Sequence, residues 1–348
     1  MWAATLAKLH NGLTAATMMA AARLGRPAPG GCRPPAAAMA YRKVFIGGHP
    51  RSGTTWLTRI LRQHPDVICP KAESHVYRTV VDYLRRHRGP GLFGWGAILL
   101  EDYQNRKLGE RSGLYQFVSR TELIQLVQTA MNRVAREPGF GEDQAAKLVI
   151  QGILDRCFRA AGGTPRQVLV EKTPNNILFV PDILRHFPGS KVVEIVRDGR
   201  DVCVSWEQRA AENPYFASFT RAAVIENWVK YVRSGLELQA DPNYAPFVHR
   251  LHYEDLKRNP ARQIARLCCF LELSFDQVLV EKIAEQTAFQ NYNVTGRGKH
   301  NRRGIVGDWQ NHFSAEQAAQ FRAMVGDLFT EAGYHYETAE QMFQAGGR

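Results

Sequence analysis

The strongest constraint on the fold is a short apolar run that ends in two glycines and leads through a loop of small residues into a helical pattern. The run Lys43–Gly48 has the length and composition of a buried strand. Beyond the loop, apolar residues recur at helical spacing from Trp56 to Leu61. A strand, a tight loop and a helix start in this order are typical of α/β proteins.

Three more apolar runs alternate with helical patterns further along the chain. The predicted strands are Val168–Val170, Val192–Val196 and Phe247–Tyr253, and a helix is predicted near Gly199–Arg209. Strands that alternate with helices predict a three-layer α/β fold, in which helices cover both faces of a central, mostly parallel sheet. Ligands of such sheets bind beyond the carboxyl ends of the strands, so residues that follow these runs are candidate site residues.

The first forty residues differ from the rest of the chain. Residues 1–40 are rich in Ala, Gly and Pro, and the first acidic residue of the chain is Asp66. Residues 1–38 fit an organellar transit peptide, or an upstream extension without a folded role that precedes a start at Met39; we favour the extension. We therefore expect a disordered leader followed by one domain over residues 41–340. The apolar part of the leader is too short and polar to cross a bilayer, and no transmembrane segment is predicted.

Composition narrows the partners of the protein but does not identify them. The charged fraction of 22% and the hydrophobic fraction of 45% are ordinary for a globular protein. The net charge of +12 favours anionic partners, among them nucleotides, acidic glycans, membranes and nucleic acid. None of the six cysteines forms a C-x-x-C pair, so we expect reduced thiols in a cytoplasmic protein and no zinc site.

The loop after the first strand has the composition of an anion cradle. In Gly48–Thr55, small residues allow successive backbone N–H groups to turn toward an anion, and the helix start adds partial positive charge. Arg51 supplies a cation within the loop, and Ser52, Thr54 and Thr55 supply hydroxyl groups. These features predict a phosphate-binding or sulfate-binding loop.

This loop departs from the phosphate loop of ATP-dependent and GTP-dependent enzymes. Their pattern places Lys directly after the second glycine, whereas Thr54 occupies that position here. No apolar strand that ends in a magnesium-binding Asp is evident. A transfer reaction that needs no metal ion fits these residues better than an ATP-dependent reaction.

Three ordered motifs resemble those of sulfotransferases that use 3′-phosphoadenosine-5′-phosphosulfate (PAPS). The segment Pro50–Trp56 is similar to the family's 5′-phosphosulfate loop, P-[KR]-S-G-T-[TS]-W/L. Arg197, at a strand end, and Ser205, eight residues later, resemble its 3′-phosphate segment, and this spacing lets both side chains reach one phosphate. Arg302–Trp309 resembles the signature R-[KR]-G-x-x-G-D-W. The resemblance covers essentially the whole domain, except residues 1–40 and much of 75–165.

The resemblance implies a donor site made of residues from several segments. Two further echoes are a Y-E-D segment at Tyr253 and a T-x-F element at Thr287, both of which lie near the purine in the family. Trp56 either stacks on the adenine or belongs to the core. The implied donor-binding residues are Arg51, Ser52, Gly53, Thr54, Thr55, Trp56, Arg197, Ser205, Tyr253, Thr287, Phe289, Arg302, Arg303 and Gly304.

The catalytic residues follow from weaker resemblances. Lys172 stands in an E-K-T-P element like that of several membrane-associated and bacterial sulfotransferases, where the Lys approaches the phosphosulfate; the alternative is a surface pair with Glu171. The K-x-H element that carries the base of cytosolic members is not found. Other branches use a Glu shortly after the first helix, which makes Glu73 the candidate base and His75 the reserve. Arg51 would stabilise the departing phosphate.

The resemblance implies transfer of a sulfuryl group from PAPS to an acceptor hydroxyl or amine, with release of 3′-phosphoadenosine-5′-phosphate (PAP) and without a metal ion. A small molecule, a lipid or a saccharide fits as acceptor, and residues 75–165 would form a helical insertion on the acceptor side. One alternative is a kinase-like phosphotransferase, which would need magnesium and the missing Lys. Another is a polyanion-binding or nucleic-acid-binding protein, which would group basic and aromatic residues on one face. Here the informative basic residues stand singly, so no nucleic-acid partner is expected.

Overall fold

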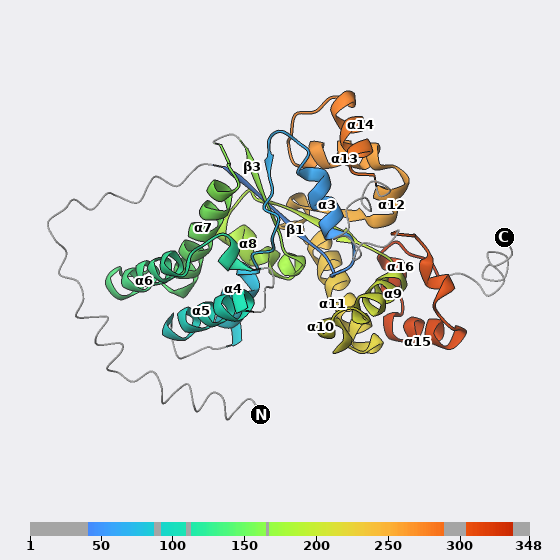
Figure 1. Cartoon of the computed structure of the whole chain (residues 1–348), viewed down its shortest axis with the longest axis horizontal. Helices are drawn as coiled ribbons and strands as arrows, with labels where there is room; N and C mark the ends of the chain where they lie inside the picture. Colours follow the sequence, from blue (N-terminus) through green and yellow to red (C-terminus); the bar gives the residue numbers. More distant parts are fainter. Residues whose placement is uncertain (1–40, 87–91, 109–112, 165–166, 289–303, 337–348) are drawn as a thin grey trace. The chain divides into compact units, whose positions relative to one another are not determined.

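The computed structural model describes residues 41–86, 92–108, 113–164, 167–288 and 304–336 (Figure 1). A five-stranded sheet in the order β2-β3-β1-β4-β5 lies at its centre, and each neighbouring pair of strands is parallel. The strands are β1 (Arg42–Gly47), β2 (Val67–Ile68), β3 (Val168–Lys172), β4 (Lys191–Val196) and β5 (Val248–His252). The predicted α/β fold with a parallel sheet is confirmed. The predicted leader lies outside the described residues.

The predicted strands shift only slightly in the structure, and one strand escaped prediction. β3 runs two residues beyond the predicted end, so that Glu171 and Lys172 close the strand. β2 pairs Val67 with Val168 and has only two residues, too few to produce a recognisable pattern. Helix α9 (Gly199–Ala210) matches its predicted span to within one residue.

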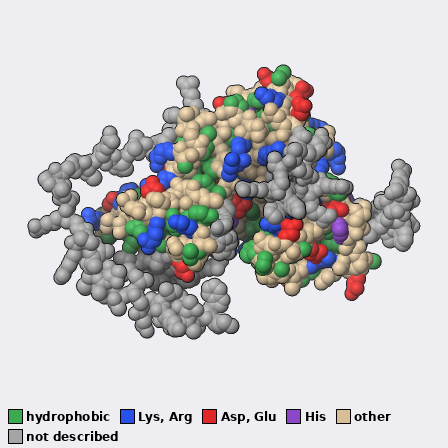
Figure 2. Space-filling model, viewed as in Figure 1, with side chains coloured by type: hydrophobic (Ala, Val, Ile, Leu, Met, Phe, Trp, Pro, Cys, Tyr) green, Lys and Arg blue, Asp and Glu red, His purple; other side chains and the backbone are tan. Residues whose placement is uncertain are grey.

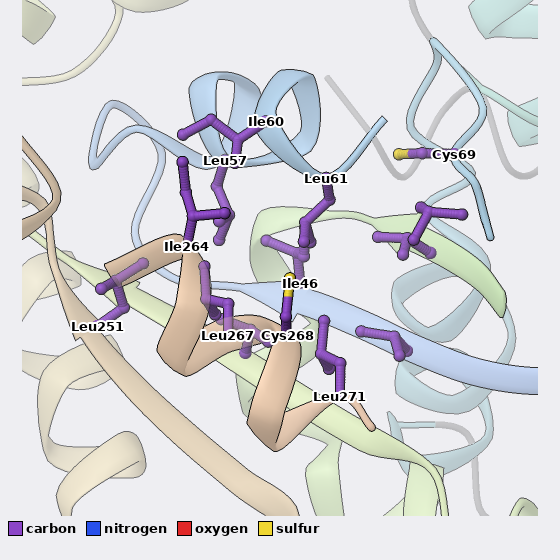
Figure 3. Close-up of a cluster of buried hydrophobic side chains, with 14 of the residues drawn as sticks. Ile46, Leu57, Ile60, Leu61, Cys69, Leu251, Ile264, Leu267, Cys268 and Leu271 are labelled. Carbon is purple, nitrogen blue, oxygen red and sulfur yellow. The ribbon is translucent and has the colours of Figure 1, made fainter. Parts of the chain in front are cut away.

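Alternation of side chains along the strands divides the core between the two faces of the sheet. Val44 and Ile46 of β1 pack in one cluster with α3 (Thr54–Leu61), whereas Phe45 between them faces the opposite side. The helices that complete this cluster are α12 (Tyr253–Arg258), α13 (Pro260–Phe270) and α14 (Gln277–Gln286). Figure 3 shows Leu57 and Ile60 of α3 above Ile46, with side chains of α13 beside them.

Helices on the opposite face of the sheet pack against the strand side chains that point away from α3. Phe45 lies 5.8 Å from Tyr77 and 6.4 Å from Phe187 between ring centroids. These rings belong to α4 (Val76–Arg86) and to the residue that follows α8 (Val180–His186). Toward the other edge, α11 (Arg221–Ala240) packs with α9, α15 (Ala315–Val325) and α16 (Leu328–Glu331) in a second cluster around Trp228.

The segment between β2 and β3 consists of helices within the described residues. They are α4, α5 (Leu92–Leu108), the 3-10 turn η1 (Leu114–Gln116), α6 (Arg120–Arg136) and α7 (Glu142–Ala160). The sequence predicted helices only in the second half of 75–165, whereas α4 and α5 occupy the first half as well. Other short elements are η2 (Pro174–Phe179), α10 (Pro214–Ala217), η3 (Ala245–Phe247) and η5 (Asp308–Asn311). The role of residues 75–165 as an insertion on the acceptor side stays a prediction, and so do the predicted limits of the domain.

No helix within the described ranges is sufficiently long and apolar to cross a membrane.

One charged pair lies deep in the molecule, between the last two strands. The Arg250 guanidinium donates to both carboxylate oxygens of Glu194, at 2.8 and 3.2 Å, and to the Val232 carbonyl at 3.0 Å. Gly235 of α11 makes room for it, because a Cβ there would lie 2.1 Å from Glu194 Oε1. Both charged side chains are buried, so each depends on the other.

Arg250→Met should leave Glu194 buried without its cation and lower the free energy of unfolding by about 3–5 kcal/mol at neutral pH. Burial already raises the pKa of Glu194, and loss of the Arg250 charge removes the main opposing influence. A raised folded-state pKa gives stability that is present at low pH and lost as the pH rises through it. The deficit of the variant should therefore shrink toward acid pH in urea denaturation.

The matched control is the double variant Arg250→Met/Glu194→Gln, in which no buried charge remains. It should recover part of the lost stability and lose the extra pH dependence. A deficit of the single variant that is the same at every pH would contradict the role given to the Glu194 charge.

Candidate functional site

The loop from β1 to α3 is held in an unusual backbone conformation. Gly48 and Gly53 have φ angles of +133° and +102°, and Arg51, with a full side chain, has +77°. A Cβ on Gly48 would lie 2.3 Å from the Ile195 carbonyl oxygen, so only glycine fits there. A strained, non-glycine residue in a tight loop indicates a functional constraint. The predicted anion cradle therefore has a loop geometry that matches it.

Arg51 and Ser205 come together although they stand far apart in the sequence. The Arg51 Nε–H donates a hydrogen bond of 3.1 Å to Ser205 Oγ on α9. The Arg197 guanidinium reaches the same loop, with 3.5 Å from Nη1 to the Arg51 carbonyl oxygen. The structure thus brings side chains from both predicted phosphate segments to one place. Thr54 is buried at the start of α3, whereas Thr55 is exposed.

Two buried polar atoms at this place have no hydrogen-bond partner among the described residues. They are Ser52 Oγ and Arg197 Nε. Burial of an unsatisfied polar atom costs about 1–3 kcal/mol, which a folded protein tolerates where a ligand completes the bonding. Both atoms donate hydrogen bonds, and Arg197 is a cation, so the missing partner fits an anion. The residues present therefore suit a phosphorylated ligand.

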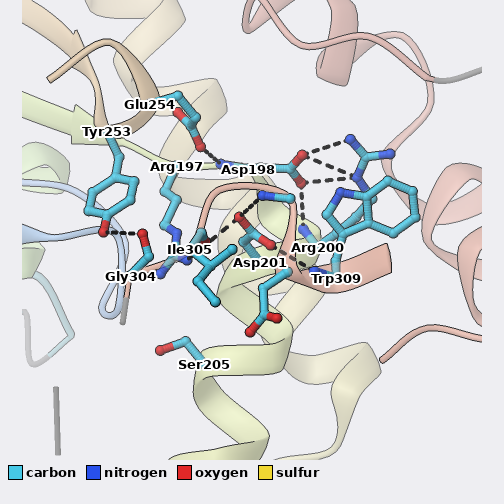
Figure 4. Close-up of polar contacts among 12 residues, drawn as sticks. Arg197, Asp198, Arg200, Asp201, Ser205, Tyr253, Glu254, Gly304, Ile305 and Trp309 are labelled. Carbon is cyan, nitrogen blue, oxygen red and sulfur yellow. Dashed lines mark hydrogen bonds and ion pairs between the residues drawn. The ribbon is translucent and has the colours of Figure 1, made fainter. Parts of the chain in front are cut away.

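The segment 304–309 is anchored beside Arg197 (Figure 4). The backbone N–H groups of Gly307 and Trp309 each donate a 2.9 Å hydrogen bond to the Asp201 carboxylate. Burial raises the pKa of Asp201, and the nearby Arg197 charge opposes this rise. The Tyr253 hydroxyl donates to the Gly304 carbonyl at 3.0 Å, and Arg197 Nη2 donates to the Ile305 carbonyl at 3.0 Å.

Asp198 begins α9 and supports Arg197 by its own bonds. Its carboxylate accepts from the Arg200 backbone N–H at 2.8 Å and from the Arg200 guanidinium at 2.7 Å. Its backbone N–H donates to Glu254 at 3.0 Å. The acidic residues next to Arg197 are therefore structural partners within the fold. Phe289, Arg302 and Arg303 lie outside the described residues.

The residues predicted to lie near the purine, Trp56, Tyr253 and Thr287, are buried and lie close together. The Trp56 indole N–H donates to the Thr287 carbonyl at 2.9 Å, and the Trp56 ring meets the Tyr253 ring edge to face, 5.4 Å between centroids. Burial raises the pKa of Tyr253 to about 12, so its hydroxyl stays protonated. Gly53 packs against this ring, because a Cβ there would lie 2.7 Å from it.

Glu73, His75 and Lys172 form a cluster where β3 ends. The Lys172 ammonium contacts Glu73 Oε1, and His75 Nε2 lies 3.2 Å from Glu73 Oε2. Burial acts to raise the pKa of Glu73, but the hydrogen bond from His75 and the charge of Lys172 lower it to about 2. Lys172 is buried and pairs with Glu73 rather than with Glu171, unlike the surface pair considered from the sequence.

The sequence did not reveal the role of Glu171, which organises this cluster. Its buried carboxylate accepts from the Ser74 backbone N–H and hydroxyl, at 3.2 and 2.7 Å. It also accepts from the Thr173 hydroxyl at 2.7 Å and the Asn176 amide at 2.6 Å. Ser74 follows Glu73, and Thr173 follows Lys172, so Glu171 fixes both neighbours at once. A carboxylate at the end of an apolar strand was the available signal, because it needs partners when buried.

His49 supports the loop from within the protein. Burial lowers the pKa of His49 to about 4, so the ring is neutral near pH 7. A proton on Nδ1 donates to the Pro50 carbonyl at 2.7 Å, and Nε2 then accepts from the Asn227 amide at 3.2 Å. Its ring lies 5.3 Å from that of Tyr231, whose hydroxyl accepts a 2.7 Å hydrogen bond from Asn175. His49 thus helps to shape the loop.

The proteins to which the chain is similar are sulfotransferases. Residues 43–277 match the model of the sulfotransferase family. The chain is 30% identical to mouse sulfotransferase 1B1 over 160 residues, which are 38% of the chain and 52% of that protein. It is 26% identical to a putative protein-tyrosine sulfotransferase of Caenorhabditis briggsae over 238 residues, 68% of each. The chain thus spans about half the length of the mouse relative.

A solved structure shows the same fold. The crystal structure of mouse sulfotransferase SULT7A1 complexed with PAP superimposes with a TM-score of 0.50, at 18% identity and over 88% of each chain. The described residues contain no group of three or more His, Cys, Asp or Glu placed to hold a metal ion. The predicted absence of a metal from the reaction stays a prediction.

Two buried serines test the unsatisfied hydroxyl of the loop. Ser52→Ala removes a buried hydroxyl without a partner and should raise the free energy of unfolding of the unliganded protein by about 1 kcal/mol. Ser74→Ala is the matched control, because its hydroxyl is bonded to Glu171, and it should lower stability by about 1–2 kcal/mol. Chemical denaturation measures both. Equal losses in the two variants would contradict an unsatisfied Ser52 hydroxyl.

Proposed function

The chain belongs to the sulfotransferase family, and we propose on that basis that it transfers a sulfuryl group from PAPS to an acceptor hydroxyl or amine and releases PAP. The pair of unsatisfied donors, Ser52 Oγ and Arg197 Nε, carries the proposal. They lie in the two segments that the sequence assigned to the two phosphate ends of one nucleotide. The complex of mouse SULT7A1 with PAP supports the same choice of ligand.

We assign the 5′-phosphosulfate end to the loop and the 3′-phosphate to the region around Arg197. Arg51, Ser52 and the loop amides supply donors and a cation at the first end. To the second end we assign Arg197 and Ser205, each of which contacts Arg51 in the structure. Residues that the sequence adds to this donor site are Gly53, Thr54, Thr55, Trp56, Tyr253, Thr287, Phe289, Arg302, Arg303 and Gly304.

The reaction needs a proton acceptor and stabilisation of the departing charge. PAPS supplies a sulfuryl group attached to a phosphate that can leave. Glu73 takes the proton from the acceptor hydroxyl or amine as the bond from that atom to sulfur forms and the bond from sulfur to the phosphate oxygen breaks. Arg51, Lys172 and the loop amides stabilise the negative charge on the released phosphate.

The contact between Glu73 and Lys172 links base strength to donor binding. With a pKa of about 2, Glu73 is ionised but is a weak base. An anion that attracts the Lys172 ammonium would weaken its hold on Glu73 and so raise the pKa of this carboxyl. The base would then gain strength when the donor is bound.

The other readings have less support. A kinase-like phosphotransferase would need a cation where Thr54 stands. A polyanion-binding protein would gather its basic side chains, whereas Lys and Arg are scattered over several elements on the face shown in Figure 2. The cytoplasmic location stays a prediction, and so does the choice among small-molecule, lipid and saccharide acceptors.

PAP should raise the melting temperature of the protein in the presence of EDTA, because the proposed site needs no metal. At a concentration of 100 times Kd, a ligand stabilises by about 2.7 kcal/mol. Arg197→Met should weaken PAP binding about tenfold or more, since the buried guanidinium supplies charged donors, while exposed Arg233→Met should not. No shift with PAP, beside a clear shift with Mg-ATP, would refute the sulfotransferase proposal.

Glu73→Gln should keep the PAP-induced shift in melting temperature and abolish turnover, because the amide cannot accept the acceptor's proton as a carboxylate does. Turnover is measured with labelled PAPS against a panel of acceptors. Glu316→Gln, an exposed change on α15, serves as the control and should retain activity. Full turnover in Glu73→Gln would assign the base elsewhere, with His75 as the next residue to test.

A further inference from the structure

A set of aromatic side chains on α9, on α10 and directly after α10 lies partly in solvent. This aromatic array consists of Trp206, Tyr215, Phe216 and Phe219. Ring centroids are 4.8 Å apart for Trp206 and Phe216, 5.4 Å for Trp206 and Phe219, and 5.5 Å for Tyr215 and Phe219. Tyr215 is 50% exposed and Phe219 is 41% exposed, whereas Trp206 is buried. Grouped exposed aromatic rings mark a binding surface more often than a solvated one.

The array continues inward to the proposed active site. The Trp206 ring lies 5.8 Å from the His49 ring, and His49 lies 5.3 Å from Tyr231. The Tyr231 hydroxyl accepts from Asn175, three residues beyond Lys172. A path of ring contacts and one hydrogen bond therefore connects the exposed rings with the phosphate loop and with the end of β3. The array and the proposed active site therefore contact the same buried residue, His49.

A cation stands near the inner end of the array. Arg78, in the first turn of α4, is exposed, and within the described residues no hydrogen bond or ion pair holds it. Burial raises the pKa of Tyr231, and the charge of Arg78 opposes this rise. Helices α4 and α11 also both pack on η2, which follows Lys172. Figure 2 shows the outline of this face indented between the α4–α5 side and the α10 side.

We propose that the aromatic array is the acceptor-binding surface and that it takes a flat aromatic acceptor with an anionic substituent, which pairs with Arg78. The inference rests on the proposed sulfotransferase function and adds the class of its acceptor. Edge-to-face and stacked ring contacts favour a planar ring. A saccharide needs several polar partners, whereas the array offers the Tyr215 hydroxyl and an indole N–H of Trp206 that already donates to the Phe216 carbonyl. The otherwise unpaired cation favours a negative charge on the bound molecule.

The full-length chain saturated with PAP is titrated with three probes by ligand-observed NMR. The probes are 4-hydroxybenzoate, its neutral analogue 4-hydroxybenzamide, and methyl β-D-glucuronide. The array should bind both benzene derivatives and prefer the anionic one by about threefold to fivefold, the range of a partly exposed ion pair. The glucuronide should bind at least tenfold more weakly. Binding of the glucuronide alone would overturn the proposal in favour of a saccharide acceptor.

Variants test the two parts of the proposal separately. Tyr215→Ser/Phe219→Ser should weaken both benzene probes about tenfold or more, and Arg78→Gln should remove only the preference for the anionic probe. Phe275→Ser, which changes a 38% exposed Phe ahead of α14, is the matched control and should bind as the wild type does. Wild-type affinity in the double variant would overturn the assignment of the array.

The PAP-induced shift in melting temperature is measured for each variant to separate this inference from the function on which it rests. A retained shift shows a folded protein with an intact donor site, so that lost probe binding supports the array as the acceptor surface. A retained shift together with no probe binding in the wild type refutes the acceptor class and leaves the proposed function standing. No shift in the wild type refutes the proposed function itself.

Discussion

The buried carboxylate of Glu171 determines how the proposed catalytic groups lie relative to the sheet. It closes β3 and accepts four hydrogen bonds from three residues that belong to two separate segments. One segment carries Glu73, and the other continues from Lys172 into η2, where Asn175 meets α11. Since a buried ionised group must be saturated with donors, these bonds cannot be exchanged freely for water. The positions of Glu73 and Lys172 thus depend on the hydrogen bonds to Glu171, a residue that need not touch the substrate.

Some buried polar and charged groups of the described residues have partners, and others do not. Away from the site, the charges of Glu194 and Arg250 satisfy each other, and Asp198 is saturated by Arg200. At the loop, Ser52 Oγ and Arg197 Nε are buried without partners, and Arg51 has a strained backbone. Four other buried atoms of the described residues also lack a partner: His75 Nδ1, Gln208 Nε2, Arg221 Nη1 and His249 Nε2. At the loop, however, two such donors lie beside a strained residue, and a bound ligand relieves defects of this kind. The location of the defects therefore supports an anion site more strongly than the net charge of +12 does.

Local sequence patterns predicted the sheet because the chain's strands are buried, apolar and bounded by glycine or charged residues. The loop, Arg197 and Lys172 could be predicted for the same reason, since functional residues follow strand ends in a parallel sheet. β2 could not, because two residues carry no periodicity. Glu171, Tyr231 and Asn227 were missed because their importance comes from partners distant in sequence, such as Ser74, which no local pattern encodes. The aromatic array on α10 was missed because core and exposed rings look alike in a sequence.

In the proposed reaction, the charge of Lys172 links the donor side of the site to the base. Lys172 pairs with Glu73 in the structure, yet the same ammonium, at the end of β3, is the one proposed to stabilise the released phosphate. The Lys172 ammonium can bond to Glu73 and to the donor anion only in turn, or to each of them more weakly, because both bonds use its three N–H groups. The contact of His75 with the other oxygen of Glu73 would still orient the carboxylate when Lys172 turns to the donor. Donor binding would thus prepare the base, and an acceptor on the aromatic array would meet a stronger base only after the donor is in place.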